Sequence, residues 1–265
     1  MEIPKIIHYC WFGRNPLPES ALRCIESWQT FFPDYEIKQW NEDNFDVNII
    51  PYTQEAYSAK KYAFVSDYAR FYLLHQYGGL YFDTDVEVIK SFSPILAYGP
   101  FMGCERDSTD SGGIGVNAGL GLGALPGMDI YQKILTQYQT LHFIREDGSL
   151  NIKTVVDYVT NTLKDHGLQD VPGIQQVADI RIYPKEYFCP KIMDTDDIHI
   201  TENTYSIHHY DASWADELDR RSGRRAVKLK KIFGNRLGNM INVVIYGWQK
   251  YGFWDALKRA ERKHQ

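Results

Sequence analysis

The chain has 265 residues, of which 44% are hydrophobic, 14% aromatic and 24% charged, so it is long enough to bury a full core. It holds no run of eighteen apolar residues, and its first residues lack the basic leader and apolar stretch of a signal peptide, so we expect a cytoplasmic protein without a membrane span. The four cysteines are scattered with no CxxC pair, which favours reduced thiols over disulfides or a zinc site.

The net charge of −5 conceals an uneven distribution along the chain. From Arg220 onward there are thirteen Lys and Arg against two acids, a net +11, so the preceding 219 residues carry −16. This break predicts two parts, a catalytic domain over residues 1–218 and a basic, amphipathic, helical tail over residues 219–265.

Apolar periodicity predicts an alternation of strands and helices. In chain order the expected elements are a strand at 3–10, a helix at 18–32, a strand at 35–40, helices at 128–141 and 154–168, and a strand at 180–190. The opening order of strand, helix and strand indicates an α/β architecture.

The most informative stretch runs from residue 56 to residue 88. Aromatic residues recur at three- and four-residue steps over its first two thirds, which predicts a helix that ends at the glycine pair Gly78-Gly79. On such a helix Asp67 and Arg70 are neighbours on one face. An isolated pair of this kind is often only a solvated ion pair.

Two aspartates follow the short apolar strand expected at residues 80–82. Strand side chains alternate between faces, so Asp83 and Asp85 are expected on one face, roughly 7 Å apart. Two carboxylates in a core need a cation, donors or water, and their oxygens suit Mg²⁺ or Mn²⁺. Structural pairing with Arg70 is the alternative. A second Asp-X-Asp at residues 194–196 has no strand before it and reads as turn chemistry or a solvated cluster.

Other patterns are ambiguous when taken alone. The glycine-rich residues 111–127 contain no GxGxxG between strand and helix and no GK[ST], so we expect loops and small-residue packing close to a ligand. His208 and His209 could be surface residues, although imidazole beside carboxylates also accepts Mn²⁺. Trp11 and Trp214 are more often core or rim aromatics than ligand platforms.

Three stretches in this order and spacing carry a resemblance to a known family: IPKIIHYCWFG (3–13), SDYARFYLLHQYGGLYFDTDVEV (66–88) and SIHHYDASW (206–214). Together they resemble glycosyltransferase family 32, whose sugar-binding region carries a DxD. That family includes yeast-type initiating mannosyltransferases and bacterial capsule and exopolysaccharide enzymes, and is distantly similar to the clostridial glucosylating toxins. The resemblance spans roughly residues 3–215. It implies a GT-A fold, a Rossmann-like and mainly parallel sheet flanked by helices, which binds a nucleotide sugar and a divalent ion, usually Mn²⁺.

The resemblance also implies roles for individual residues. The catalytic set it implies is Asp67, Arg70, Asp83 and Asp85. The metal ligands would be Asp83 and Asp85, completed by His209 or His208. The residues implied to contact the nucleotide sugar are Trp11, Tyr81, Ser213, Trp214 and His8. Acceptor contacts are expected from Glu105 and Asn117.

The expected function is therefore that of a metal-dependent, retaining glycosyltransferase. It would move a sugar from a UDP-linked donor to a glycan or lipid-linked oligosaccharide in bacterial surface-polysaccharide assembly. A metal-dependent phosphohydrolase or nucleotidyltransferase would also use paired aspartates, but Trp11 before them and the Ser213-Trp214 motif after them argue against it. A non-catalytic sugar-nucleotide-binding relative is disfavoured by the intact Asp83/Asp85 pair.

The basic tail suggests a further partner. Residues 219–265 mix Lys and Arg with Ile, Val, Trp and Phe, which suits a helix lying on anionic lipid at the inner face of the cytoplasmic membrane. A helical pair that docks on the catalytic domain is the alternative. Nucleic acid is not expected, because the body is acidic and no recognition helix or RNA-stacking motif is present.

Overall fold

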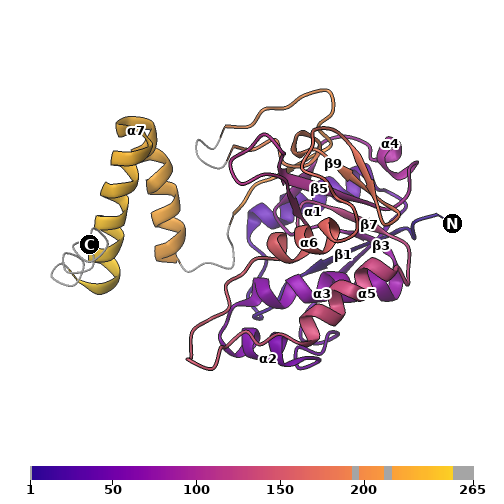
Figure 1. Ribbon diagram of the computed structural model, residues 1–265, viewed down its shortest axis with the longest axis horizontal. Coiled ribbons are helices and arrows are strands. Elements are labelled where there is room, and N and C mark those ends of the chain that lie inside the picture. The colour runs from indigo at the N-terminus through magenta and orange to yellow at the C-terminus, as the bar shows by residue number, and fades with distance from the viewer. Residues whose placement is uncertain (1, 193–196, 212–216, 253–265) are drawn as a thin grey trace. The chain divides into compact units, whose positions relative to one another are not determined.

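The computed structural model describes residues 2–192, 197–211 and 217–252 (Figure 1). The chain forms two compact units, one of residues 1–190 and 200–209, the other of residues 191–199 and 210–265. Among the described helices, none combines the length and the apolar character that a membrane crossing requires.

A central sheet organises the first unit. Its strands are β1 (Ile6–Cys10), β2 (Glu36–Trp40), β3 (Gly79–Tyr81), β5 (Phe101–Arg106), β6 (Gly115–Asn117), β7 (Leu122–Ala124), β8 (Gln175–Val177) and β9 (Ile180–Tyr183). The described strands lie in the order β2-β1-β3-β7-β5-β9-β8, with β6 paired to β5. Pairing is parallel for β1 with β2 and β3 and for β5 with β9, and antiparallel for the other pairs. The expected α/β sheet is confirmed, and its pairing is mixed.

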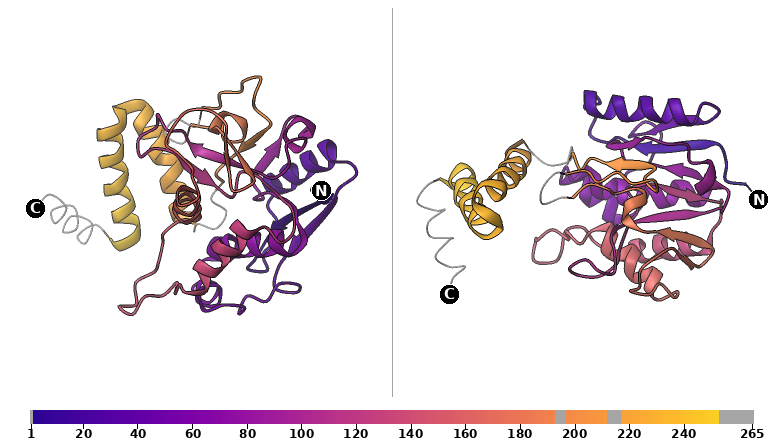
Figure 2. Two further views of the ribbon diagram at one scale, coloured as in Figure 1. Left: turned by 45° about the vertical axis from the view of Figure 1, so that its right-hand side comes forward. Right: turned by 90° about the horizontal axis from the view of Figure 1, so that it is seen from above.

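Helices cover both faces of this sheet (Figures 1 and 2). They are α1 (Glu19–Phe31), α2 (Pro51–Ser58), α3 (Tyr62–Tyr77), α4 (Ser93–Leu96), α5 (Asp129–Gln139), α6 (Val155–Lys164) and the 3-10 turn η1 (Lys185–Tyr187). Strand alternation sends successive residues of β1 to opposite faces. Tyr9 packs against Trp28 of α1, whereas Cys10 lies in the core cluster with Val65 and Phe71 of α3. Strand β1 is thus covered on both faces, as expected of a strand with parallel neighbours.

Several expected elements are confirmed close to their predicted limits. Helix α1 buries Ala21, Cys24 and Trp28 at the three- and four-residue steps that predicted it. Helix α6 begins where the Thr154 hydroxyl accepts a hydrogen bond from the Asp157 amide, as an N-cap should. All four cysteines are buried.

The glycine-rich segment differs from its prediction as loops. It contributes β6 and β7 to the sheet. A Cβ at Gly121 or Gly123 would collide with the ring of Phe82 or Phe101, respectively. Small residues are therefore needed here for close packing, as expected, but the segment supplies two strands of the sheet, β6 beside β5 and β7 between β3 and β5, and is not a loop throughout.

The second unit is dominated by α7 (Glu217–Tyr251). This helix is interrupted at Gly234, whose φ of 77° and ψ of 165° lie outside the helical region, so it consists of two arms, residues 217–233 and 235–251. A Cβ at Gly238 in the second arm would collide with the backbone of Leu229 and Lys230 in the first arm. The expected helical tail is thus a tight hairpin of two helices.

Candidate active site

A double-glycine turn leads the chain from α3 directly into β3. The Gly78 amide donates to the Leu74 carbonyl at 2.8 Å and closes the helix, with φ of 64°. Gly79 has φ of 98°, and a Cβ there would lie 2.6 Å from the Ile6 carbonyl oxygen. Both positions favour glycine, which confirms the predicted cap. The turn therefore fixes α3, with Asp67 and Arg70, close to the strand that precedes the aspartates.

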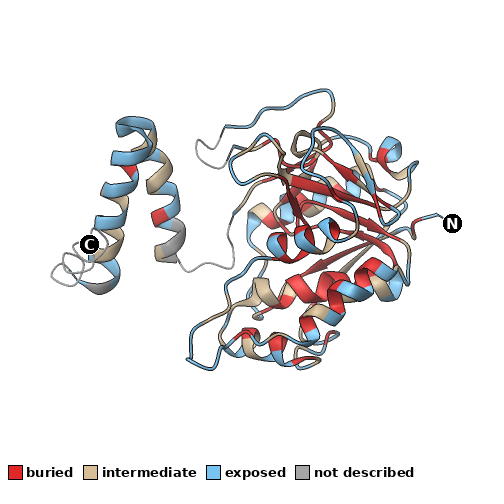
Figure 3. Cartoon of the chain, in the orientation of Figure 1, coloured by how far each residue is buried: buried red, intermediate tan, exposed pale blue. Residues whose placement is uncertain are grey.

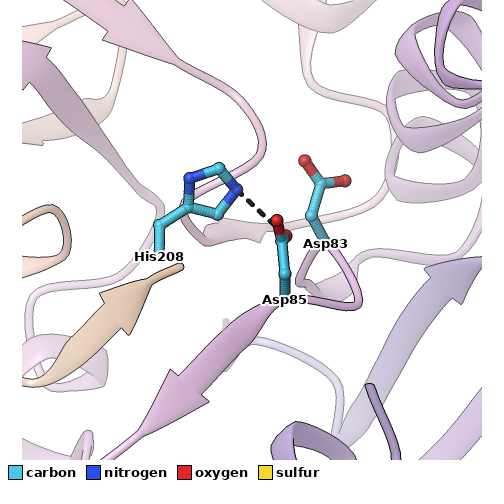
Figure 4. Close-up of side chains that lie close together, drawn as sticks. All are labelled: Asp83, Asp85 and His208. Atoms are coloured by element: carbon cyan, nitrogen blue, oxygen red, sulfur yellow. Dashed lines mark ion pairs between the residues drawn. The ribbon is translucent and has the colours of Figure 1, made fainter. Parts of the chain in front are cut away.

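Asp83 and Asp85 lie in a turn between β3 and β4 (Val86–Val88), not on a strand as expected. The Val86 amide donates to the Asp83 carbonyl at 3.0 Å, and the Asp83 amide donates to the Gly119 carbonyl at 3.2 Å. These bonds set the turn, so strand alternation does not decide where the side chains point. Both carboxylates nevertheless extend into the same region, close to a histidine (Figure 4).

That histidine is His208, which a second small sheet brings to the aspartates. Strand β10 (Ser206–His208) pairs antiparallel with β4 and sets His208 opposite Val86. The His208 Nε2 lies 3.1 Å from Asp85 Oδ1 (Figure 4). One ligand atom from each of Asp83, Asp85 and His208 lies within 4.8 Å of the other two.

His209 follows the strand and points elsewhere. Its Nε2 lies 2.8 Å from Glu87 Oε2, while its amide donates to the Asp85 carbonyl at 2.9 Å. Of the two histidines that the sequence left open, the structure therefore brings His208 to the aspartate pair, whereas His209 had been the first expectation.

Arg70 connects Asp67 to the Asp-X-Asp turn. Its Nη2 lies 3.1 Å from both Asp67 Oδ1 and Asp83 Oδ1, and its side chain is only 4% exposed. The Tyr81 hydroxyl donates to the same Asp83 oxygen at 3.1 Å. Asp83 is thus held through Oδ1 by Arg70 and Tyr81. The pairing with Arg70 had been the alternative to a metal site, but the structure has both this pairing and the cluster of Asp83, Asp85 and His208.

The electrostatics of this cluster favour a bound cation. Burial raises the pKa of Asp67 to about 7, and it also raises the pKa of Asp83 although Arg70 opposes this. Burial by itself would lower the pKa of His208, but the adjacent Asp85 carboxylate raises it above its ordinary value. The carboxyl groups of Asp67 and Asp83 share the Arg70 guanidinium, and Asp85 adds negative charge beside Asp83, so a divalent cation would relieve the repulsion between the carboxylates.

Glu105 and Asn117, the residues expected to contact the acceptor, are linked to the turn by hydrogen bonds. The register of β5 against β6 shifts between Cys104 and Arg106, so Glu105 occupies a bulge, a feature that redirects side chains. Asn117 Nδ2 donates to Glu105 Oε2 at 2.9 Å, and Asn117 Oδ1 accepts from the Gly119 amide at 2.7 Å. Gly119 in turn holds the Asp83 amide, so one chain of hydrogen bonds runs from Glu105 to the aspartates.

Gly119 and Glu87 were not singled out from the sequence. A Cβ at Gly119 would collide with Asp83 Oδ2, so this glycine leaves the space that the carboxylate occupies. Nothing in the composition of the glycine-rich segment distinguishes Gly119 from its neighbours. Glu87 could have been found from the alternation of β4, which sends Glu87 to the face opposite Val86 and Val88.

The other expected nucleotide contacts have different outcomes. Trp11 directly follows β1, the parallel neighbour of β3, so it lies at the same sheet edge as Asp83. Ser213 and Trp214 lie outside the described residues, as does the second Asp-X-Asp at 194–196.

His8 differs from its expected role. It is fully buried, its Nδ1 accepts from Trp40 Nε1 at 3.0 Å and its Nε2 lies 3.0 Å from the Gly78 carbonyl. Because an indole nitrogen only donates, the proton of the neutral ring is on Nε2 and goes to Gly78. Both nitrogens are therefore occupied inside the fold, and no nitrogen of His8 is left for a nucleotide.

Comparison with known families agrees with this geometry. Residues 18–102 match the family described as "Glycosyltransferase sugar-binding region containing DXD motif". The matched stretch contains Asp67, Arg70, Asp83 and Asp85, the residues that meet in the structure. Residues 18–102 therefore form a DXD sugar-binding region of the kind found in glycosyltransferases. The resemblance found in the sequence is confirmed.

Curated relatives of this DXD region are yeast proteins. The chain is 33% identical over 100 residues to inositol phosphoceramide mannosyltransferase 3 of Schizosaccharomyces pombe, which covers 36% of this chain and 28% of that protein. It is 28% identical over 104 residues to mannosyl phosphorylinositol ceramide synthase CSH1 of Saccharomyces cerevisiae, with 38% and 27% covered. The alignments thus span about a third of the length of these relatives, or less.

Solved structures with some likeness are also glycosyltransferases. PaToxG glycosyltransferase shares 20% identity at a TM-score of 0.46, with 62% of this chain and 69% of that chain covered. Galactosyltransferase LgtC, in complex with donor and acceptor sugar analogues, shares 15% identity at a TM-score of 0.42, with 83% and 93% covered. Both TM-scores are below 0.5, so the fold is described from the strand order and helices of this chain and not from these two structures.

Proposed function

We propose that the protein is a metal-dependent, retaining hexosyltransferase that acts in surface-polysaccharide assembly. Its donor is a UDP-linked sugar, and its acceptor is a glycan or a lipid-linked oligosaccharide. The observation that carries this proposal is the convergence of Asp83, Asp85 and His208 beside Arg70 within the DXD region. We assign the chemistry to residues 1–218, which hold all of these side chains.

The donor set fits a divalent ion. Two carboxylates and one imidazole would hold it through oxygen and nitrogen atoms, a combination that suits Mn²⁺ and, less well, Mg²⁺. Asp83 can contribute Oδ2, because its Oδ1 already accepts from Arg70 and Tyr81. Such an ion would offset the negative charge that gathers on a diphosphate leaving group.

The transfer itself breaks one bond and forms one bond at the anomeric carbon. The bond from that carbon to the diphosphate oxygen breaks, the acceptor hydroxyl oxygen bonds to the same face, and the hydroxyl proton passes to the leaving phosphate oxygen. No protein nucleophile is required for this retaining route. The task of the chain is therefore to position groups and to stabilise charge as it develops.

Each described residue of the site then has a distinct role. Arg70 and Tyr81 orient Asp83, and Asp67 holds Arg70 in place from the other side. Trp11, at the carboxyl end of β1, offers a ring for the nucleotide base. Glu105, held by Asn117 in its bulge, offers a carboxylate to an acceptor hydroxyl.

Donor and acceptor classes can be narrowed by experiment. The yeast relatives are named for mannosyl transfer and for inositol phosphoceramide, so GDP-mannose and a lipid-linked acceptor are the second set to test beside UDP-sugars. Because the alignments cover little of those proteins, the choice between UDP and GDP depends on measurement.

The decisive measurement is calorimetric titration of UDP and of GDP, with and without Mn²⁺, into the wild-type protein and Asp85→Ala. We expect Mn²⁺-dependent binding of UDP that the substitution abolishes. Asp194→Ala, in the second Asp-X-Asp, is the matched control and should bind as wild type does. Binding of GDP alone would redirect the donor to a mannose type. Failure of both nucleotides to bind with Mn²⁺ present would contradict the proposal.

A further inference from the structure

Exposed apolar side chains are concentrated on α7 of the second unit. Of the seventeen large hydrophobic residues that are exposed in the described chain, seven lie on this helix. They are Ile232, Phe233, Leu237, Met240, Val243, Val244 and Trp248. Figure 3 shows that buried positions on α7 are few. Scattered exposed apolar residues need no explanation, whereas a group of this size on one hairpin marks an interaction surface.

The two arms of the hairpin differ in composition. The first arm carries seven cations: Arg220, Arg221, Arg224, Arg225, Lys228, Lys230 and Lys231. In the second arm residues 237–249 contain no charged residue at all. The first arm is therefore strongly cationic, whereas the long stretch 237–249 of the second arm, between Arg236 and Lys250, is uncharged and largely apolar.

Polar side chains of the hairpin meet between its arms. Arg225 Nε donates to Asn242 Oδ1 at 2.8 Å, and Arg225 Nη1 donates to Gln249 Oε1 at 2.9 Å. Asn242 Nδ2 donates to Ser222 Oγ at 3.1 Å, and Gly238 lies against the backbone of the first arm. Hydrogen bonds and a close backbone approach thus join the arms where a water-soluble hairpin would place an apolar seam.

Four exposed apolar residues of the second arm lie on its other side. Leu237, Met240, Val244 and Trp248 follow each other at steps of three, four and four residues, so they form one stripe along the helix. All four are exposed, Trp248 by 57%. The hairpin thus combines hydrogen bonds between its arms with an apolar stripe that faces outward.

We propose that this hairpin binds an anionic lipid bilayer. The stripe of Leu237, Met240, Val244 and Trp248 enters the interfacial region, and the cations of the first arm meet the lipid headgroups. A tryptophan on the stripe suits this depth, because its ring is apolar and its N–H is polar. The enzyme would then be a peripheral membrane protein.

Charge favours a lipid bilayer over the two other partners that this surface could bind, a second copy of the chain and nucleic acid. A second copy would bring two hairpins together, each with nine Lys and Arg against two acids and so a net +7, and their repulsion opposes a dimer through this surface. Nucleic acid would satisfy the cations but would leave the apolar stripe in water. An anionic bilayer satisfies both the cations and the stripe. The proposal does not depend on the transferase activity.

Flotation of the full-length chain with vesicles tests the proposal. We expect binding to phosphatidylcholine vesicles that contain phosphatidylglycerol, little binding to phosphatidylcholine alone, and weaker binding at high salt. The stripe variant Leu237→Ser/Met240→Ser/Val244→Ser/Trp248→Ser and the charge variant Arg224→Glu/Lys228→Glu should each weaken binding by at least about tenfold. The matched control, Ile152→Ser/Val171→Ser/Ile174→Ser, removes exposed apolar residues from the first unit and should float as wild type does.

Circular dichroism and nucleotide titration of each variant show whether it is folded. If the fourfold stripe variant loses helical structure, the single variant Trp248→Ser is tested in its place. Wild type that does not float with anionic vesicles would overturn the proposal. So would a folded stripe variant that floats like wild type, since binding would then be electrostatic only. If light scattering shows a wild-type dimer that the stripe variant converts to monomer, the surface joins copies of the chain and the lipid proposal is wrong.

Discussion

Arg70 and Asp83 are thirteen residues apart and on different elements, yet Arg70 Nη2 lies 3.1 Å from Asp83 Oδ1. The same nitrogen is 3.1 Å from Asp67 Oδ1, so one buried guanidinium links the helix α3 to the Asp-X-Asp turn. This linkage fixes the orientation of Asp83 before any ligand binds, and it leaves the other carboxylate oxygen for the site.

Replacing Arg70 by alanine should therefore lower the stability of the protein. It leaves Asp67 and Asp83 buried without their cation, and we expect the free energy of unfolding to fall by about 3–5 kcal/mol. Urea titration measures this. Arg23→Ala, which breaks the exposed ion pair with Glu19 on α1, is the control and should cost less than about 1 kcal/mol. Equal effects of the two substitutions would show that the Arg70 linkage is not structural.

A methyl group at position 119 should disturb the site with little effect on the fold as a whole. In Gly119→Ala the new Cβ would collide with Asp83 Oδ2, so the carboxylate must move, and we expect nucleotide binding in Mn²⁺ to weaken by about tenfold or more. Calorimetric titration measures the affinity. Gly223→Ala, at a position with open space around it, serves as the control. Unchanged affinity in Gly119→Ala would mean that Asp83 Oδ2 is not used.

Substitution of His208 and substitution of His209 should have different effects on the affinity for Mn²⁺. His208→Ala removes the imidazole beside Asp85, and we expect the affinity for Mn²⁺ to fall by at least about tenfold. His209→Ala removes the partner of Glu87 and should produce a smaller loss. Manganese binding followed by electron paramagnetic resonance gives both affinities. The reverse ranking would restore His209 as the ligand.

Buried His8 should make the fold sensitive to acid. Burial, with a smaller contribution from the nearby Lys38, lowers the pKa of His8 from 6.5 to about 4. Between these values the unfolded chain binds a proton that the native chain does not, so stability is greatest above pH 6.5 and falls as the pH drops toward 4. The full effect of this one group is about 3 kcal/mol.

Urea unfolding of wild type and His8→Gln at pH 7 and pH 4.5 measures this effect. The loss of stability between the two pH values should be smaller by about 2–3 kcal/mol in the variant, because glutamine does not titrate. The variant itself will be less stable at pH 7, since it cannot reproduce both hydrogen bonds of the imidazole. An identical acid loss in both proteins would exclude His8 as its source.

Much of the site could be anticipated from local sequence. The Gly78-Gly79 cap, the helix with Asp67 and Arg70, and the aspartates after an apolar strand all depend on neighbours in the chain, and the structure has each of them. Local reasoning was wrong where the backbone leaves the strand: Asp83 and Asp85 lie in a turn, so their proximity does not come from alternation.

The other features of the site depend on strand pairing between segments that are far apart in the sequence. Whether His208 or His209 reaches the aspartates is decided by the register of β10 on β4, which links segments about 120 residues apart and has no local signal. The insertion of β7 between β3 and β5 likewise follows from the close packing of Gly121 and Gly123 against aromatic rings. Composition alone could not separate these glycines from loop residues.

The burial of all four cysteines has a practical consequence for labelling. Burial raises the pKa of Cys10 to about 12 and that of Cys104 still higher, so these two carry almost no thiolate near neutral pH. A maleimide dye added to the native protein should therefore leave the original sulfurs unmodified. A single cysteine placed at exposed Met240 or Tyr98 would become the one reactive handle, and a fluorophore there could report on either unit separately in the intact chain.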